Sequence, residues 1–278
     1  MFGKLLKNDL KAQFHSVNVI FFVVAVLSVT FTLISVISDE PVKKVLSALA
    51  CFVGTLLAFV FLIFAVAGLY SKTMFGRAGY LTLSLPVKTS KLVWSKTVSG
   101  LIWIGLSFGI FLLSTVFLWK TLVDILGEDA ANAADDLLVL FGAPSVKTIV
   151  LYLFYYILEL AILSLALVQS IYFGITISHV SPFSRLGRFG SIIFIFVTLY
   201  LVSELSSKFG QIFPAGMCIA TDEIVFTSDI YKTISSLKQN SAMVYLPVNF
   251  SAPALQLVLS LLLNIPTAYL VKNEVNVQ

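Results

Sequence analysis

The chain has 278 residues, of which 59% are apolar and only 12% are charged, and its mean hydropathy is +1.00. A soluble protein carries about 25% charged residues, so this chain has too few charges to cover a surface in water. The net charge is +4, but the basic residues are scattered among long apolar runs, which excludes a nucleic-acid partner. We therefore predict an all-α, polytopic protein whose solvent is the lipid bilayer.

The first 16 residues predict an amphipathic helix that lies on the membrane surface. Apolar side chains recur at helical spacing on one face, and lysines 4, 7 and 11 recur on the other. The apolar face consists of Phe2, Leu5, Leu6, Leu10 and Phe14. Two interpretations of this interfacial helix are open: an anchor and topology signal at anionic lipid, or a lever joined to the first span.

Residues 17–278 predict a transmembrane domain of six helices. A spanning helix needs about 20 predominantly apolar residues, because the hydrocarbon layer is about 30 Å thick. The six segments that qualify are residues 17–38, 45–70, 97–119, 148–178, 187–205 and 253–271. Pro266 lies inside the last segment and predicts a kink there.

The distribution of charge predicts which side of the membrane each loop faces. With the amino terminus inside, the inner side holds eleven basic and two acidic residues, and the outer side holds seven basic and eleven acidic. This bias fits the positive-inside rule, so we predict a plasma-membrane protein with both termini in the cytoplasm. The longest outer loop, residues 204–252, has enough apolar side chains to form an ordered cap.

The cytoplasmic loop of residues 71–96 contains five basic residues and no acid. Gly76, Gly79 and Pro86 predict turns that interrupt any continuous helix. Tyr80 and its neighbours between these turns need a protein surface or lipid headgroups to bury them, which is typical of a docking element for a soluble partner. The alternative is a basic loop that only sets the topology. That alternative explains the charges but not the glycines, proline and apolar residues.

The sequence of this loop resembles a known family. The segment Gly-Arg-Ala-Gly-Tyr-Leu-Thr-Leu-Ser-Leu-Pro-Val at residues 76–87, followed by Ser95-Lys96, is similar to the loop between spans two and three of ABC-2 type ABC transporter permeases. The interfacial helix, six spans, cytoplasmic termini and large final outer loop extend the resemblance over the whole chain. Within the family the likeness is greatest to exporters of amphipathic peptides of the phenol-soluble modulin type. Ala78 departs from the family, which often has an acid at this position.

The resemblance implies an ATP-driven exporter whose ATPase is a separate cytoplasmic subunit docked on residues 71–96. It further implies a second copy of the permease, with ATP and Mg²⁺ held by the ATPase subunits. The residues that would make the docking contact are Phe75, Arg77, Tyr80, Leu81, Leu83 and Pro86. The chain itself agrees in one respect, because it contains no G-x-x-x-x-G-K-[ST] phosphate-binding segment. We therefore expect no nucleotide site, no cofactor and no enzymatic activity in this chain alone.

Glu159 is the only acid well inside a predicted span. It lies roughly 16 Å from the outer end at 1.5 Å per residue, where an ionisable group costs on the order of 2.5 to 3.5 kcal/mol. One hypothesis is that Glu159, with Tyr152, Tyr155, Tyr156 and Gln169 of the same helix, lines a path for a cationic or amphipathic substrate. The alternative is a protonated Glu159 that hydrogen-bonds to a neighbouring helix.

Other function classes find less support in the sequence. Neither His15 nor His179 has other metal ligands at a suitable spacing, and Cys51 and Cys218 form no metal or disulfide pattern. We find no catalytic set of a membrane enzyme. The alternative function is that of a secondary transporter or channel-like protein without an ATPase. Such a protein usually places several polar or charged groups along its path, whereas this chain offers a single glutamate. Lipids, amphipathic peptides and hydrophobic drugs suit the apolar chain equally, and only the resemblance favours peptides.

Overall fold

The structure is a computed structural model that describes residues 2–38, 40–76, 79, 82, 84, 86–126, 146–181, 183–219, 224–233 and 246–273. The chain divides into two compact units. The first comprises Met1–Ala130, Ile171–Ile195 and Asn264–Gln278, and the second comprises Ala131–Ser170 and Phe196–Leu263. Each unit is described separately below.

Six apolar stretches long enough to cross a membrane occur among the described residues, which confirms a multi-pass membrane protein. The helices that carry them are α1 (Phe2–Ile37), α2 (Pro41–Met74), α4 (Thr89–Leu126), α6 (Val146–Ser178), α7 (Gly187–Ile212), and α9 (Ser251–Leu262) together with α10 (Asn264–Asn273). In the 18-residue apolar window that marks each stretch, between 11% and 22% of the residues are buried inside the protein. The remaining side chains therefore need lipid as their apolar environment.

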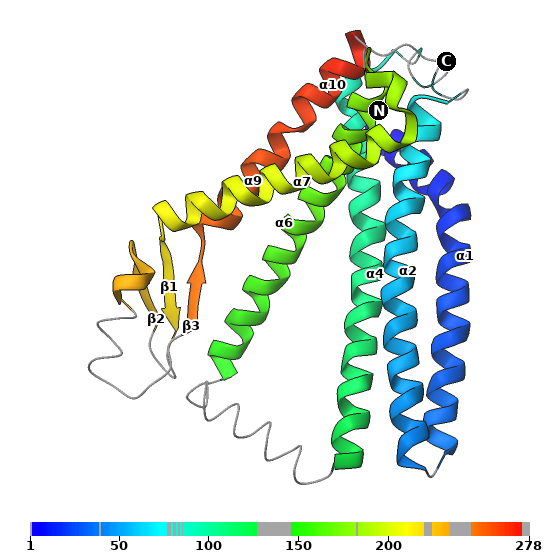
Figure 1. The fold of residues 1–278 in the computed structure, drawn as a ribbon, viewed down its shortest axis with the longest axis vertical. Helices are drawn as coiled ribbons and strands as arrows, with labels where there is room; N and C mark the ends of the chain where they lie inside the picture. The colour runs from blue at the N-terminus through cyan, green and yellow to red at the C-terminus, as the bar shows by residue number, and fades with distance from the viewer. Residues whose placement is uncertain are drawn as a thin grey trace. The chain divides into compact units, whose positions relative to one another are not determined.

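The first three helices are longer than the spans that the sequence predicts. They have 36, 34 and 38 residues, which corresponds to about 50 to 57 Å against the roughly 30 Å of hydrocarbon. Helix α1 is continuous from Phe2, so the predicted interfacial segment and the first span belong to one helix. In Figure 1 the first turns of α1 lean away from the line of its remaining length.

In the first unit, α1, α2 and α4 pack against one another along their lengths (Figure 1). A hydrogen bond of 2.8 Å joins the hydroxyls of Thr55 in α2 and Ser114 in α4, a polar link typical of membrane helices. Trp103 of α4 is buried and lies 6.0 and 5.9 Å from the rings of Phe14 and Phe21 in α1. Aromatic contacts therefore join α1 to the middle of α4.

Helices α6 and α7 approach closely within the first unit. A Cβ atom at Gly174 of α6 would lie 2.6 Å from the backbone nitrogen of Ile195 in α7, so only glycine allows this spacing. The connection between the two helices contains a short 3-10 helix, η1 (Phe183–Leu186). Gly187 begins α7 with a φ of 54°, a left-handed conformation that a side chain would strain.

The second unit contains a sheet that the all-α prediction did not include. Strands β1 (Gly216–Ile219), β2 (Ile224–Thr227) and β3 (Leu246–Asn249) pair antiparallel in the order β2-β1-β3. Met217 and Val248 form its buried face, against which Leu151, Tyr152 and Tyr155 of α6 pack. Within the predicted outer loop of residues 204–252, residues 204–212 belong to α7, and the sheet follows them. Burial raises the pKa of the Cys218 thiol on β1.

Asn249 joins α7 to α9 within the second unit. Its Oδ1 accepts hydrogen bonds of 2.9 and 2.7 Å from the backbone nitrogen and hydroxyl of Ser251, and its Nδ2 donates 3.2 Å to the carbonyl of Gly210. The side-chain amide thereby positions the start of α9. The Asn-Phe-Ser sequence at residues 249–251 formally matches a glycosylation site, but here its amide has a structural role.

The last apolar stretch consists of two helices, α9 and α10, that are separated at Leu263. Pro266 lies in the first turn of α10, where its missing N–H removes no hydrogen bond. The interruption at Leu263 falls three residues before the proline.

We expect the substitution Gly174→Ala to destabilise the protein by about 1 to 3 kcal/mol, because the added methyl group forces α6 and α7 apart. The thermal unfolding midpoint of the purified protein in detergent measures the effect. Gly105→Ala on α4 is the control, since no atom lies within 4 Å of a Cβ there. Equal midpoints for the two variants would contradict the close approach of α6 and α7.

Candidate functional site

A column of four aromatic rings lies in the first unit at the end of α2 and α6. The rings of Tyr70 in α2 and Tyr172 in α6 stack at 3.9 Å with an interplanar angle of 10°. Phe75 meets Tyr70 edge-on at 5.9 Å and stacks on His179 at 4.2 Å. We call His179, Phe75, Tyr70 and Tyr172 the aromatic column. Because Tyr70, Phe75 and Tyr172 are buried, the column forms part of the core of this unit.

Hydrogen bonds satisfy both buried tyrosine hydroxyls. Tyr70 bonds to the Thr176 hydroxyl at 3.0 Å, and Thr176 in turn donates to the carbonyl of Tyr172 at 2.7 Å. Tyr172 donates at 3.1 Å to the backbone carbonyl of Lys96 in α4. The column therefore connects α2 and α6 to the first turns of α4.

A buried ion pair continues this network to α1. The Lys96 ammonium lies 3.1 Å from Oδ1 of Asp9, and the Ser95 hydroxyl donates 2.6 Å to Oδ2 of the same carboxylate. The exposed fraction is 6% for the Lys96 side chain and 20% for Asp9. A buried charge is costly unless it is paired, so removal of one partner from such a pair typically costs about 3 to 5 kcal/mol.

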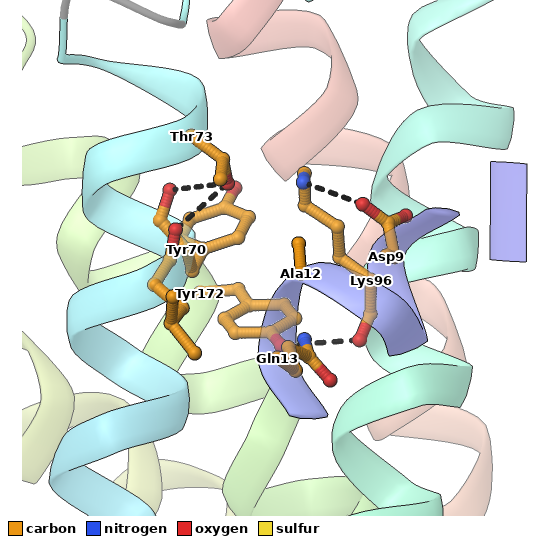
Figure 2. A pocket seen from close by; sticks show the side chains of 8 residues that line it. Asp9, Ala12, Gln13, Tyr70, Thr73, Lys96 and Tyr172 are labelled. Atoms are coloured by element: carbon orange, nitrogen blue, oxygen red, sulfur yellow. Dashed lines mark hydrogen bonds and ion pairs between the residues drawn. The ribbon is translucent and has the colours of Figure 1, made fainter. Parts of the chain in front are cut away.

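A small cavity lies beside the ion pair. The centre of a water molecule can move within about 10 Å³ of it, so the cavity has room for roughly one water. It is lined by Asp9, Ala12, Gln13, Leu69, Tyr70, Thr73, Lys96 and Tyr172. Figure 2 shows the Lys96 ammonium directed at Asp9, with the two tyrosine rings across the cavity. Gln13 is buried, and its Oε1 has no hydrogen-bond partner among the described residues.

The residues predicted to contact an ATPase fall into three groups. Phe75 is buried in the aromatic column rather than displayed on the surface, so it anchors the start of the loop. Pro86 is exposed near the loop's other end. Arg77, Tyr80, Leu81 and Leu83 lie outside the described residues. A bond of 2.7 Å from the Gly79 nitrogen to the Gly76 carbonyl forms the predicted turn.

His179 links the second loop of the same end to the column. Its Nδ1–H donates 2.8 Å to the carbonyl of Ile175, and its ring lies flat on Phe75. In the part of the chain that the structure describes, no group of three or more His, Cys, Asp or Glu residues could hold a metal ion. The histidine therefore has a packing role in this arrangement.

The residues of the predicted substrate path lie in the second unit and have different surroundings. Tyr152 packs on the sheet, and Tyr155 donates 2.8 Å to the carbonyl of Asn249. Tyr156 is 54% exposed, Gln169 is fully buried, and Glu159 is partly exposed. Ten residues separate Glu159 from Gln169 along α6, about 15 Å, so the structure does not bring these two together.

Sequence reasoning missed the ion pair and the role of Gln13. The signal was present: Leu6, Asp9, Gln13 and Val17 recur three and four residues apart, which puts an acid and an amide on the inward face of the helix. Lys96, the partner of Asp9, directly precedes the apolar stretch of α4. An acid on an otherwise apolar face indicates a buried cationic partner.

We compared the chain with models of protein families, with characterised proteins and with solved structures, and none of these comparisons finds a match. Function is therefore argued from the residues and their geometry. The geometry joins the two ends of the loop of residues 71–96 to three helices. Phe75 is part of the aromatic column. Lys96 accepts a hydrogen bond from the column through its backbone carbonyl and pairs with Asp9 through its ammonium.

The aromatic column gives a direct test through Tyr70. Tyr70→Phe keeps the stacked ring and removes one hydrogen bond, so we expect a loss of about 0.5 to 1.5 kcal/mol in unfolding free energy. Tyr70→Ala removes the ring and opens a cavity, for which we expect about 3 to 5 kcal/mol. Equilibrium unfolding in mixed micelles measures both variants. Equal losses would show that the stacked ring does not hold this end together.

Proposed function

We propose that the chain is the transmembrane subunit of an ATP-driven exporter and that a separate cytoplasmic ATPase docks on the loop of residues 71–96. The observation that carries the proposal is the way this loop is fastened. Phe75, the first residue after α2, is buried in the core of the first unit, and so is Lys96, which lies about two turns inside α4. A force applied to the loop would therefore act on α2, α4 and α6 together.

The electrostatics of this end support a cytoplasmic docking surface. Its described cations include exposed lysines on α1, α2, α4 and α10, whereas its one described acid, Asp9, is neutralised by Lys96. The exposed cations are Lys4, Lys7, Lys11, Lys72, Lys88, Lys91, Arg185 and Lys272. Such an excess is typical of a cytoplasmic side, where an ATPase and its nucleotide would be found.

The proposal assigns the chemistry of ATP to the partner subunit. The chain has no phosphate-binding segment of its own, so ATP and Mg²⁺ would be held by the ATPase. The resemblance to ABC-2 permeases supports a complex of two permease copies in the plasma membrane, each with one ATPase docked from the cytoplasm. Both termini of each permease would face the cytoplasm.

We further propose that the exported substrate is amphipathic or hydrophobic and that peptides are the best candidates. Helix α6 presents Tyr156 and the partly exposed Glu159 among apolar side chains. Aromatic rings and one carboxylate suit an apolar molecule with a positive charge. The resemblance to peptide exporters is what favours peptides over lipids and drugs.

Docking on the loop is tested by placing a charge in it. We expect Tyr80→Glu and Leu83→Glu each to abolish co-purification of the proposed ATPase subunit, because a buried unpaired carboxylate is costly at an interface. The control is Ser184→Glu, which adds the same charge at an exposed position of the other loop at this end. An ATPase that still co-purifies with both loop variants and keeps its activity coupled to substrate would show that docking occurs elsewhere.

The role of Glu159 in transport is tested by Glu159→Gln, which removes the charge and keeps the size of the side chain. If Glu159 lines the path, we expect at least a tenfold loss of export for a cationic amphipathic peptide, about 1.4 kcal/mol. A neutral amphipathic peptide should be exported normally. The measurement is efflux from loaded vesicles, with substrate-stimulated ATP hydrolysis recorded in parallel. Unchanged efflux of the cationic peptide would leave Glu159 with a packing role.

A further inference from the structure

The ion pair of Asp9 and Lys96 differs from the other ion pairs among the described residues. Those others, Glu40 with Lys43, Glu204 with Lys208 and Asp229 with Lys232, join neighbours three or four positions apart in sequence, and each has an exposed lysine. The pair of Asp9 and Lys96 joins two helices, α1 and α4, and its lysine is almost completely buried. Exposed pairs contribute little to stability, whereas a buried pair between two helices fixes their positions relative to each other.

The polar groups around this pair fit a closed cluster. One N–H of the Lys96 ammonium is directed at Asp9 Oδ1, and the ammonium has two further donors. Gln13 Oε1, an acceptor without a partner among the described residues, lines the same cavity, which has room for about one water. A water that accepts from Lys96 and donates to Gln13 would satisfy both side chains. Asp9 and Gln13 lie one turn apart on α1, and both line this cavity together with Lys96.

Lys96 is also the last residue of the segment 71–96, and the structure places it in the first turns of α4. Its side chain binds α1 through Asp9, and its backbone carbonyl accepts the hydroxyl of Tyr172 from α6. Ser95, the residue before it, donates to the same Asp9 carboxylate. The first turns of α4 are therefore connected directly to α1 and to α6.

We propose that Asp9, Ser95 and Lys96 form a lock that makes the first turns of α1 move as one body with the start of α4. The amino-terminal segment is then a lever rather than a passive surface anchor. Its lysines 4, 7 and 11 remain exposed on the opposite side, free to contact anionic lipid while the inward face is held. Asp9 acts as a positioning residue. Its role in transport rests on the proposed function, whereas its role in holding α1 does not.

The lock is tested first on the purified chain without an ATPase. In Asp9→Asn the buried Lys96 loses its counter-charge, so we expect hydrogen–deuterium exchange of the amides of residues 2–14 to rise at least about tenfold. Exchange in α7 should be unchanged. Glu204→Gln is the matched control, because it breaks an exposed pair within one helix and should alter exchange in residues 2–14 by less than about twofold. Unchanged exchange in Asp9→Asn would overturn the proposal.

Two further variants keep the test decisive. If Asp9→Asn does not fold, Ser95→Ala removes only the hydrogen bond to the Asp9 carboxylate, and we expect a rise of a few fold in the same amides. The reversed pair, Asp9→Lys with Lys96→Asp, should bring exchange back toward the wild-type value. A folded Ser95→Ala without the rise, or a reversed pair no better than Asp9→Lys alone, would count against the lock.

The second readout is coupling in the assembled complex. We expect Asp9→Asn to retain the ATPase and its basal ATP hydrolysis but to lose most of the stimulation by substrate, and the reversed pair to recover it. Normal stimulation in Asp9→Asn would refute the lever role. If no ATPase binds the wild-type chain, the proposed function fails, and the exchange experiment still decides whether the lock exists.

Discussion

The absence of water inside the bilayer is the constraint on which this structure depends. A polar group in the hydrocarbon region must find its partner within the protein, and several side chains of the first unit find theirs on another helix. Thr55 of α2 hydrogen-bonds to Ser114 of α4, and the hydroxyls of Tyr70 and Tyr172 each hydrogen-bond to a residue of another helix. At the boundary of the apolar region, the same rule brings Asp9 to Lys96. Each of these contacts therefore meets the hydrogen-bonding need of a buried polar group and also holds one helix against another.

The same constraint explains why the spans could be predicted and their ends could not. Length and apolar composition identify a membrane helix because the bilayer demands both, and all six predicted stretches are present. The helices continue into water, where the backbone remains hydrogen-bonded and hydropathy no longer marks an end. Helix α2 thus runs past Tyr70 to Met74, and α4 begins at Thr89 rather than near residue 97. The strands escaped prediction because four-residue strands give too short a pattern to separate from a loop.

The site could be predicted as a region but not as an arrangement. The glycines, proline and basic residues of the loop of residues 71–96 indicate its importance. Phe75, near the start of this loop, is indeed buried in the core. Yet Phe75 was expected at a docking surface, and the structure buries it on His179, a residue about one hundred positions away. Stacking between distant segments has no local pattern in a single sequence. The ion pair of Asp9 could not be predicted for a related reason. The charge bias of the loops assigns Asp9 to one side of the membrane, but it does not indicate whether its side chain faces the neighbouring helices.

The contact of Trp103 with Phe14 and Phe21 gives the protein an intrinsic optical probe. An indole that is buried between two phenyl rings, with its Nε1 free of hydrogen bonds among the described residues, emits at short wavelength compared with one in water. The chain has only two other tryptophans, Trp94 and Trp119. Replacement of both by phenylalanine would leave a single emitter whose spectrum shifts when α1 leaves α4. The position of the first helix against α4 could then be followed in real time, without a label.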